Sequence, residues 1–396
     1  MRYLTVFHYG ALTLAALPIA FIRIISTVYI VDKLGVDPAL AGTYTISATV
    51  LGVFVTYLGS KGYIDRLNPL VVMGVSLFFN CATCIGLLFA QASLLWLVPS
   101  IIFDGCAQLL MPSLFMYDER FNKNRADQST VYSIRLLISG VWIVAPPVGF
   151  YLYSYFGFSI FTFIVCLCAL LSLFVALSLR KISEHQIVVT SLSKPPPSTH
   201  PNKWGDNQGG NISISTFIFF IMLLITSVNV LHAMSFPLYL LQTMKASPLM
   251  PGVGAGIAAV SEVLVIYALG KFSKARSEET ILVAALLLGV LYFSLYHFQP
   301  AAVELVLLQA LYGAHFAASS AIGLAIINRH RTAGVGSAAS LFFNASKLGS
   351  VFGSLLFAAF ASEFGYYNLL ANLSLFLLIA SCIMLILARR QVIKIW

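Results

Sequence analysis

Charged side chains are scarce in this sequence. They make up 9% of its 396 residues, whereas about a quarter of the residues in an ordinary soluble protein are charged. Hydrophobic residues reach 59%, so the chain has too few polar side chains to cover a water-facing surface of this size. This shortage argues against a soluble enzyme and indicates a protein whose outer surface faces lipid.

The sequence also lacks the residue clusters that metal sites and nucleophilic enzymes need. All six cysteines lie in apolar segments. Cys81 and Cys84 are spaced as CxxC but have no second ligand pair or nearby histidine. We therefore expect no metal, no cofactor and no enzymatic activity. We also expect no cleavable signal peptide, because the first apolar segment is too long and lacks a small-residue cleavage site.

The net charge of +9 could indicate a nucleic-acid partner, but the basic residues occupy short turns between apolar runs rather than one stripe. Membrane loops explain this placement better. If the N-terminus is cytoplasmic, almost all lysines and arginines outside the apolar runs fall in cytoplasmic loops, and the opposite loops hold only Lys33 and Lys245. The positive-inside rule then predicts that both termini are cytoplasmic and that the partner is lipid, not nucleic acid.

Twelve stretches are long and apolar enough to span a bilayer, which takes about 20 apolar residues. A polar stretch rich in proline and glycine, 180–213, separates six from six and is predicted to be a cytoplasmic linker. The predicted domains are an N-terminal bundle at 1–179, the linker, and a C-terminal bundle with a short tail at 214–396. The predicted spans are 6–30, 39–60, 69–90, 94–116, 129–153, 156–179, 214–241, 250–272, 280–298, 302–327, 333–360 and 365–388.

Two six-helix halves joined by a cytoplasmic linker resemble the major facilitator superfamily. The resemblance implies an all-α membrane protein with twelve transmembrane helices in two pseudo-symmetric bundles. It also implies that a substrate binds near the membrane midplane while the halves rock about the site. The first, fourth, seventh and tenth helices would line the cavity, and the third, sixth, ninth and twelfth would face lipid. A monomer is expected for this fold.

Ionisable residues deep in apolar segments are candidate functional positions, because each costs at least about 2.5–3.5 kcal/mol at the bilayer centre. They avoid the four helices that the fold would place against lipid, apart from one histidine at a helix end. For any single residue, a structural pair between helices remains the alternative to a functional role. The candidates are Arg23, Asp104, Arg135, His232, Glu262, His315 and Lys347, joined by the amides Gln108, Asn229 and Asn344.

Asp104 and Glu262 are the candidate proton carriers, because a carboxyl group can change its proton occupancy when burial or a nearby cation changes. Arg135 and Lys347 lie in equivalent helices of the two halves. The histidines titrate near neutrality when unperturbed, yet a lone histidine facing a helix more often serves only as a hydrogen-bonding residue.

The turn after the second predicted helix carries Gly62, Asp65 and Arg66. It resembles the gating motif of the superfamily, which clamps the cytoplasmic ends of helices in the outward-facing state. The match is partial, since the basic run that normally follows is replaced by Asn68, Pro69 and Leu70. The clamp is therefore expected to be weaker or differently built.

The fifth predicted helix loosely resembles the glycine-proline motif of antiporters, in which a kink and close packing shape the gate. An ordinary proline kink in a membrane helix is the alternative. The residues concerned, which are gating candidates, are Gly140, Pro146, Pro147 and Gly149.

A longer pattern runs from Pro112 to Phe158 and continues through Phe236-Pro237-Leu238 and the run from Gly334 to Asn344. It resembles the sugar efflux transporter family, most strongly from Pro112 to Phe158. The resemblance implies proton-driven export of sugars or small glycosides across the inner membrane of a bacterium. Arg135, Glu262 and Asn344 are matching positions.

Arg23 and Lys347 depart from that family pattern, in which these positions are polar but uncharged. Two added cations would fit an anionic sugar derivative or a carboxylate-bearing metal chelator better than a neutral sugar. The alternative function is therefore export of an anionic metabolite, metallophore or drug. A non-transporting membrane sensor on the same fold is a further alternative, although the linker and tail are too short to hold a signalling domain.

Overall fold

The computed structural model describes residues 2–58, 69–110, 113–114, 129–190, 212–272, 278–329 and 335–393. Within these ranges nine helical stretches are long and apolar enough to cross a membrane. Two of them, Leu137–Val175 and Asn344–Met384, have 39 and 41 residues, about twice what one crossing needs. The predicted multi-pass helical architecture is confirmed, and the number of twelve crossings stays a prediction.

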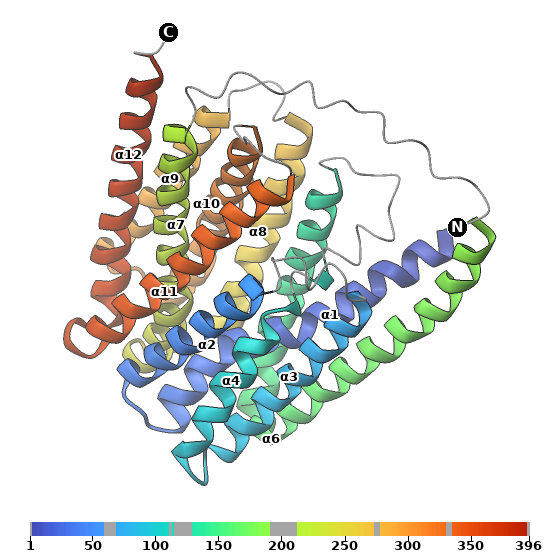
Figure 1. The fold of residues 1–396 in the computed structure, drawn as a ribbon. Coiled ribbons are helices and arrows are strands. Elements are labelled where there is room, and N and C mark those ends of the chain that lie inside the picture. Colours follow the sequence, from blue (N-terminus) through green and yellow to red (C-terminus); the bar gives the residue numbers. More distant parts are fainter. Residues whose placement is uncertain are drawn as a thin grey trace.

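The helices form two bundles, one from each half of the chain (Figure 1). The N-terminal bundle contains α1 Arg2–Val28, α2 Pro38–Leu58, α3 Pro69–Phe89, α4 Leu97–Ala107 and α6 Ser129–Thr190. The C-terminal bundle contains α7 Ile212–Leu238, α8 Met250–Phe272, α9 Glu278–Ser294, α10 Ala302–Arg329, α11 Val335–Asn368 and α12 Leu375–Ile393. Short 3₁₀ and π segments lie at Tyr29–Lys33, Leu94–Trp96, Tyr239–Thr243, Leu295–Phe298 and Leu369–Ser374.

Two glycines break the longest helices at equivalent places in the two halves. Gly157 in α6 has φ 81° and ψ 172°, and Gly365 in α11 has φ 72° and ψ 161°. Residues with a Cβ atom essentially never adopt this backbone conformation, so glycine is required at both turns. Each break separates two spans that the sequence also predicts as separate. Beyond the second of these spans, α6 continues through Thr190, inside the stretch predicted to be linker.

The ends of α1 and α7 repeat the same irregular geometry. A π turn follows each helix, and Leu34 and Met244 donate their backbone N–H to the carbonyls of Tyr29 and Tyr239, both at 3.0 Å. In each half the chain then continues through a residue with a left-handed backbone conformation, Gly35 in one half and Lys245 in the other. This repeated backbone is the structural signature of an internal duplication.

At the end away from both termini, glycines bring the two bundles into close contact. A Cβ atom on Gly42 of α2 would lie 2.6 Å from the Cβ atom of Ala358 in α11. A Cβ atom on Gly252 of α8 would lie 2.7 Å from the carbonyl oxygen of Pro146 in α6. Toward the termini the two bundles diverge (Figure 1). The protein is therefore closed at the end opposite its termini by two equivalent glycine contacts.

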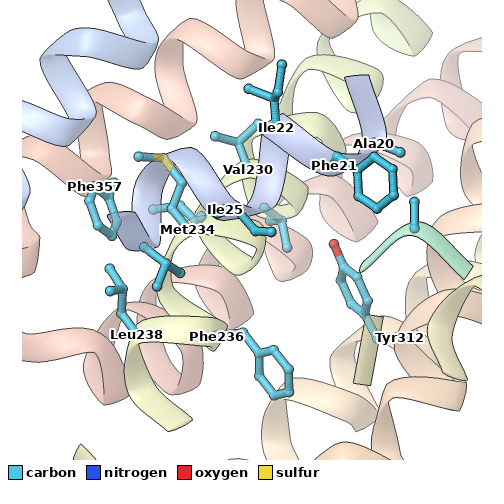
Figure 2. Close-up of a cluster of buried hydrophobic side chains, with 14 of the residues drawn as sticks. Ala20, Phe21, Ile22, Ile25, Val230, Met234, Phe236, Leu238, Tyr312 and Phe357 are labelled. Atoms are coloured by element: carbon cyan, nitrogen blue, oxygen red, sulfur yellow. The ribbon is translucent and has the colours of Figure 1, made fainter. Parts of the chain in front are cut away.

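Apolar side chains from both halves pack together beside α1 (Figure 2). We call this set the apolar seal. None of its members is more than 8% exposed, so water is excluded from this part of the interface. The seal consists of Ile22 and Ile25 of α1, Val230 and Met234 of α7, and Phe357 of α11. Phe21 of α1 packs on Phe161 of α6, within its own half.

The glycine contacts predict that a bulkier side chain opens the closed end. Gly42→Val forces α2 away from Ala358, and overpacking of this kind costs about 1–3 kcal/mol. Spin labels at Asp37 and Glu363, both exposed, measure the separation in a variant without native cysteines. We expect the distance distribution to shift to longer values. Gly270→Val is the control, because a Cβ atom at Gly270 meets nothing within 4 Å, and an equal shift there would contradict the assignment.

Candidate substrate-binding site

Arg23 lies on a different face of α1 from the apolar seal. Ile25 is 1% exposed, whereas Arg23 is exposed. With 3.6 residues per helical turn, Phe21 and Ile25 point almost opposite to Arg23. The arginine therefore leaves the seal and reaches an accessible surface in the middle of a membrane-spanning helix.

Three charged side chains from the two halves approach one another: Arg23 of α1, Asp104 of α4 and Lys347 of α11. Asp104 is within electrostatic range of both cations, and the cations are within range of each other. Within the described residues none of the three forms a direct ion pair. Because they face one another from both halves, their shared surface lies between the halves rather than against lipid.

Gln108 connects Lys347 to the N-terminal bundle. The Lys347 ammonium group donates to Gln108 Oε1 at 3.1 Å, and Gln108 Nε2 donates to the carbonyl of Ala48 in α2, also at 3.1 Å. A Cβ atom on Gly52 would lie only 2.2 Å from Gln108 Oε1, so the missing side chain of Gly52 makes room for the amide. We call Arg23, Asp104, Gln108 and Lys347 the interhalf cluster.

A second polar group, the histidine–tyrosine network, lies inside the C-terminal bundle. His232 Nε2 is 2.9 Å from the hydroxyl of Tyr292, and that hydroxyl is 2.9 Å from the hydroxyl of Tyr296. Gln309 Nε2 donates to Tyr292 at 2.5 Å. The ring of His232 also stacks on Tyr312, with centroids 3.8 Å apart. These contacts join α7, α9 and α10 into one body.

Sequence reasoning found His232 but missed its partners Tyr292, Tyr296, Gln309 and Tyr312. Their spacing carries a signal, since residues three or four apart lie on one helix face. That signal is weak, because tyrosine in an apolar run is compatible with ordinary packing. Asn229, which was predicted, accepts a hydrogen bond from the Tyr312 hydroxyl.

The remaining predicted residues of the C-terminal bundle occupy three different settings. His315 is buried, and its Nδ1 atom lies 2.7 Å from the carbonyl oxygen of Ala285 in α9, so it packs α10 against α9. Glu262 of α8 is half-buried and within electrostatic range of Tyr312. Asn344 is exposed on α11, three residues before Lys347. Asn344 thus lies about one helical turn from Lys347 of the interhalf cluster, whereas His315 contacts α9 within the C-terminal bundle.

The sequence matches the family model of the Major Facilitator Superfamily over residues 9–303. The chain belongs to this superfamily. Its relatives include sugar efflux transporter C of Escherichia coli (strain K12), which is 21% identical over 332 residues that cover 82% of this chain and 80% of the relative. Sugar efflux transporter A of the same organism is 23% identical over 298 residues, covering 74% and 73%. The predicted resemblance to sugar efflux transporters is confirmed.

Solved structures of other transporters share the fold. A bacterial homologue of the iron transporter ferroportin, in an inward-facing state, has a TM-score of 0.74 at 12% identity, covering 98% of this chain and 99% of that one. The nucleoside transporter NupG has a TM-score of 0.69 at 17% identity, covering 96% and 98%. At these identities the likeness concerns the fold alone, and it confirms the predicted major facilitator fold.

The predicted gating residues of this superfamily member lie in different settings. Gly62, Asp65 and Arg66 fall outside the described residues, as does the side chain of Arg135, whose backbone is helical in α6. Pro146 and Pro147 face glycines of α8 across the interface between the halves. A Cβ atom on Gly149 would lie 2.9 Å from Ile25 Cδ1, whereas one on Gly140 meets nothing within 4 Å. Their role in gating stays a prediction.

The contact between Lys347 and Gln108 predicts energetic coupling between the two halves. Gln108→Leu leaves the ammonium group without its amide acceptor, and hydrogen bonds to charged groups contribute about 1.5–3 kcal/mol. A double-mutant cycle with Lys347→Met, followed by thermal unfolding in detergent, should give a coupling energy well above zero. Additive effects of the two substitutions would contradict the contact.

The histidine–tyrosine network predicts a stability role for Tyr292. Tyr292→Phe removes one hydroxyl and leaves polar atoms of His232, Gln309 and Tyr296 without that partner, which costs about 1–3 kcal/mol per unsatisfied group. The thermal unfolding midpoint should fall clearly. The same change at Tyr155, which is 66% exposed, is the control and should leave the midpoint nearly unchanged.

Proposed function

We propose that this superfamily transporter exports sugar-like, hydroxylated small molecules in exchange for protons by alternating access. It would act in the inner membrane of a bacterium, with both termini in the cytoplasm. The interhalf cluster carries the proposal, because it places charged groups of both halves at one accessible surface in the middle of the membrane-spanning helices. The names of the sugar efflux relatives support the substrate class.

Alternating access requires contacts between the halves that can form and break. The closed end rests on glycine contacts and the apolar seal, neither of which contains a covalent or ionic link among the described residues. Opening that end separates α2 from α11 and α6 from α8. Lys347 then moves relative to Gln108, because the two belong to different halves.

Asp104 provides a means of coupling this motion to protons. Its carboxylate attracts Arg23 and Lys347 at once, so it stabilises the arrangement in which the halves approach. A proton on Asp104 removes that attraction. Each proton that moves inward contributes about 2.3 kcal/mol per 100 mV of membrane potential. Glu262, beside Tyr312 in the other half, is the second candidate carrier.

The proposal predicts that Asp104→Asn and Glu262→Gln separate transport from the proton gradient. In proteoliposomes, a pH gradient should drive transport by the unmodified protein but not by either of these two variants. Exchange of labelled for unlabelled substrate should persist, because exchange needs no net proton movement. The substrates to test are labelled glucose, lactose, gluconate and citrate.

One control and one further variant accompany this measurement. Glu363→Gln removes an exposed carboxylate at the end opposite the termini and should retain gradient-driven transport. Arg135→Gln tests the position shared with the sugar efflux family and should also abolish coupled transport. Undiminished gradient-driven transport by both Asp104→Asn and Glu262→Gln would overturn the assignment of the proton carriers.

A further inference from the structure

Arg23 has unused hydrogen-bonding capacity at an accessible surface. It forms no hydrogen bond or ion pair with the described part of the chain, although a guanidinium group offers five N–H donors in a fixed fork. A charged group at this depth is stable only when water or a partner compensates it. The exposed fork of Arg23 is therefore free to bind a planar acidic group with two parallel hydrogen bonds.

Lys347 also lacks a direct ionic partner among the described residues. Its partner at 3.1 Å is the amide of Gln108, which is neutral, and an ammonium group has two further N–H donors. Asp104 is the one acidic side chain whose charge acts on both cations among the described residues. The interhalf cluster thus has two positive charges and one negative charge, an excess that one anion would neutralise.

From this charge excess we propose that the substrate carries an acidic group, a carboxylate or a phosphate, bound between Arg23 of one half and Lys347 of the other. This inference rests on the proposed transport function and specifies its substrate class. A hydroxylated body beside the acidic group would meet the exposed amide of Asn344, three residues before Lys347 on α11. Sugar acids and sugar phosphates combine both features.

An anion between the halves would also couple binding to movement. Without it, Arg23 and Lys347 repel each other across the interface, since each is within electrostatic range of the other. With it, both cations are attracted to the same group, and the halves are drawn together. A ligand shifts a conformational equilibrium only by its difference in affinity for the two states. An acid that bridges Arg23 and Lys347 binds more tightly when the halves are close together than when they are apart. A neutral sugar gains no such difference in affinity from these two residues.

Ligand binding to the purified protein tests the inference without relying on transport. The thermal unfolding midpoint is measured against increasing concentrations of glucose, glucuronate, gluconate and glucose 6-phosphate. At least one acidic compound should raise the midpoint saturably, and glucose should not. Arg23→Gln and Lys347→Gln should each weaken binding of that compound about tenfold or more, which is the size expected for a lost charged hydrogen bond.

Lys33→Gln is the matched control, because Lys33 follows α1 but is exposed at the end opposite the termini. It should bind as the unmodified protein does. Arg23→Lys keeps the charge without the fork and should restore part of the affinity lost in Arg23→Gln. Size-exclusion chromatography and circular dichroism confirm that each variant is folded before binding is compared.

Three results would overturn the inference: equal or tighter binding of glucose, no acidic compound bound at millimolar concentration, or unchanged affinity in both glutamine variants. These results differ from failure of the proposed function. Saturable binding of an acid without any gradient-driven transport would refute proton-coupled export and keep the acidic site. Gradient-driven transport of glucose but of no acid would refute the acidic site and keep the transporter.

Discussion

The cost of a charge away from water governs how the two halves of this protein meet. Arg23, Asp104 and Lys347 lie in helices that are otherwise apolar, and their charges are tolerable only at an accessible surface or beside an opposite charge. The apolar seal occupies one face of α1, and Arg23 leaves by the opposite face. The interface is therefore divided between a dry region that holds the halves together and a charged region that a ligand can reach.

The internal duplication determines how this interface can move. Gly42 and Gly252 make equivalent contacts, and Gly157 and Gly365 make equivalent turns, so each half presents the same kind of surface to the other. Hydrogen bonds of the histidine–tyrosine network stay within the C-terminal bundle, which favours its movement as one body. The contacts that must change are those between bundles, and among the described residues these include close glycine packing, apolar contacts, the amide of Gln108 and the charges of the interhalf cluster.

The sequence predicts the membrane helices and the positions of the deep charges because both depend on composition along the chain. Pairing between helices depends on which faces meet, and no periodicity in these uniformly apolar runs determines that. The sequence places Lys347 in the helix equivalent to that of Arg135, but it does not predict that Lys347 donates a hydrogen bond to Gln108. The amide of Gln108 in turn donates to the carbonyl of Ala48, which lies sixty residues earlier in the chain. His315 was a candidate because it is an ionisable residue deep in an apolar segment, but in the structure its ring nitrogen contacts a backbone carbonyl in α9.

The two residues that were expected to depart from the sugar efflux pattern are the same two that leave the interface with an excess of positive charge. If Arg23 and Lys347 served only to brace helices, each would be expected to pair with an acid of its own, because an unpaired charge destabilises a membrane protein. Instead, within the described part of the chain one carboxylate acts on both, without direct contact to either. A shared acid leaves room for a second anion, so the same arrangement that makes a poor structural brace makes a good binding site for an acidic ligand.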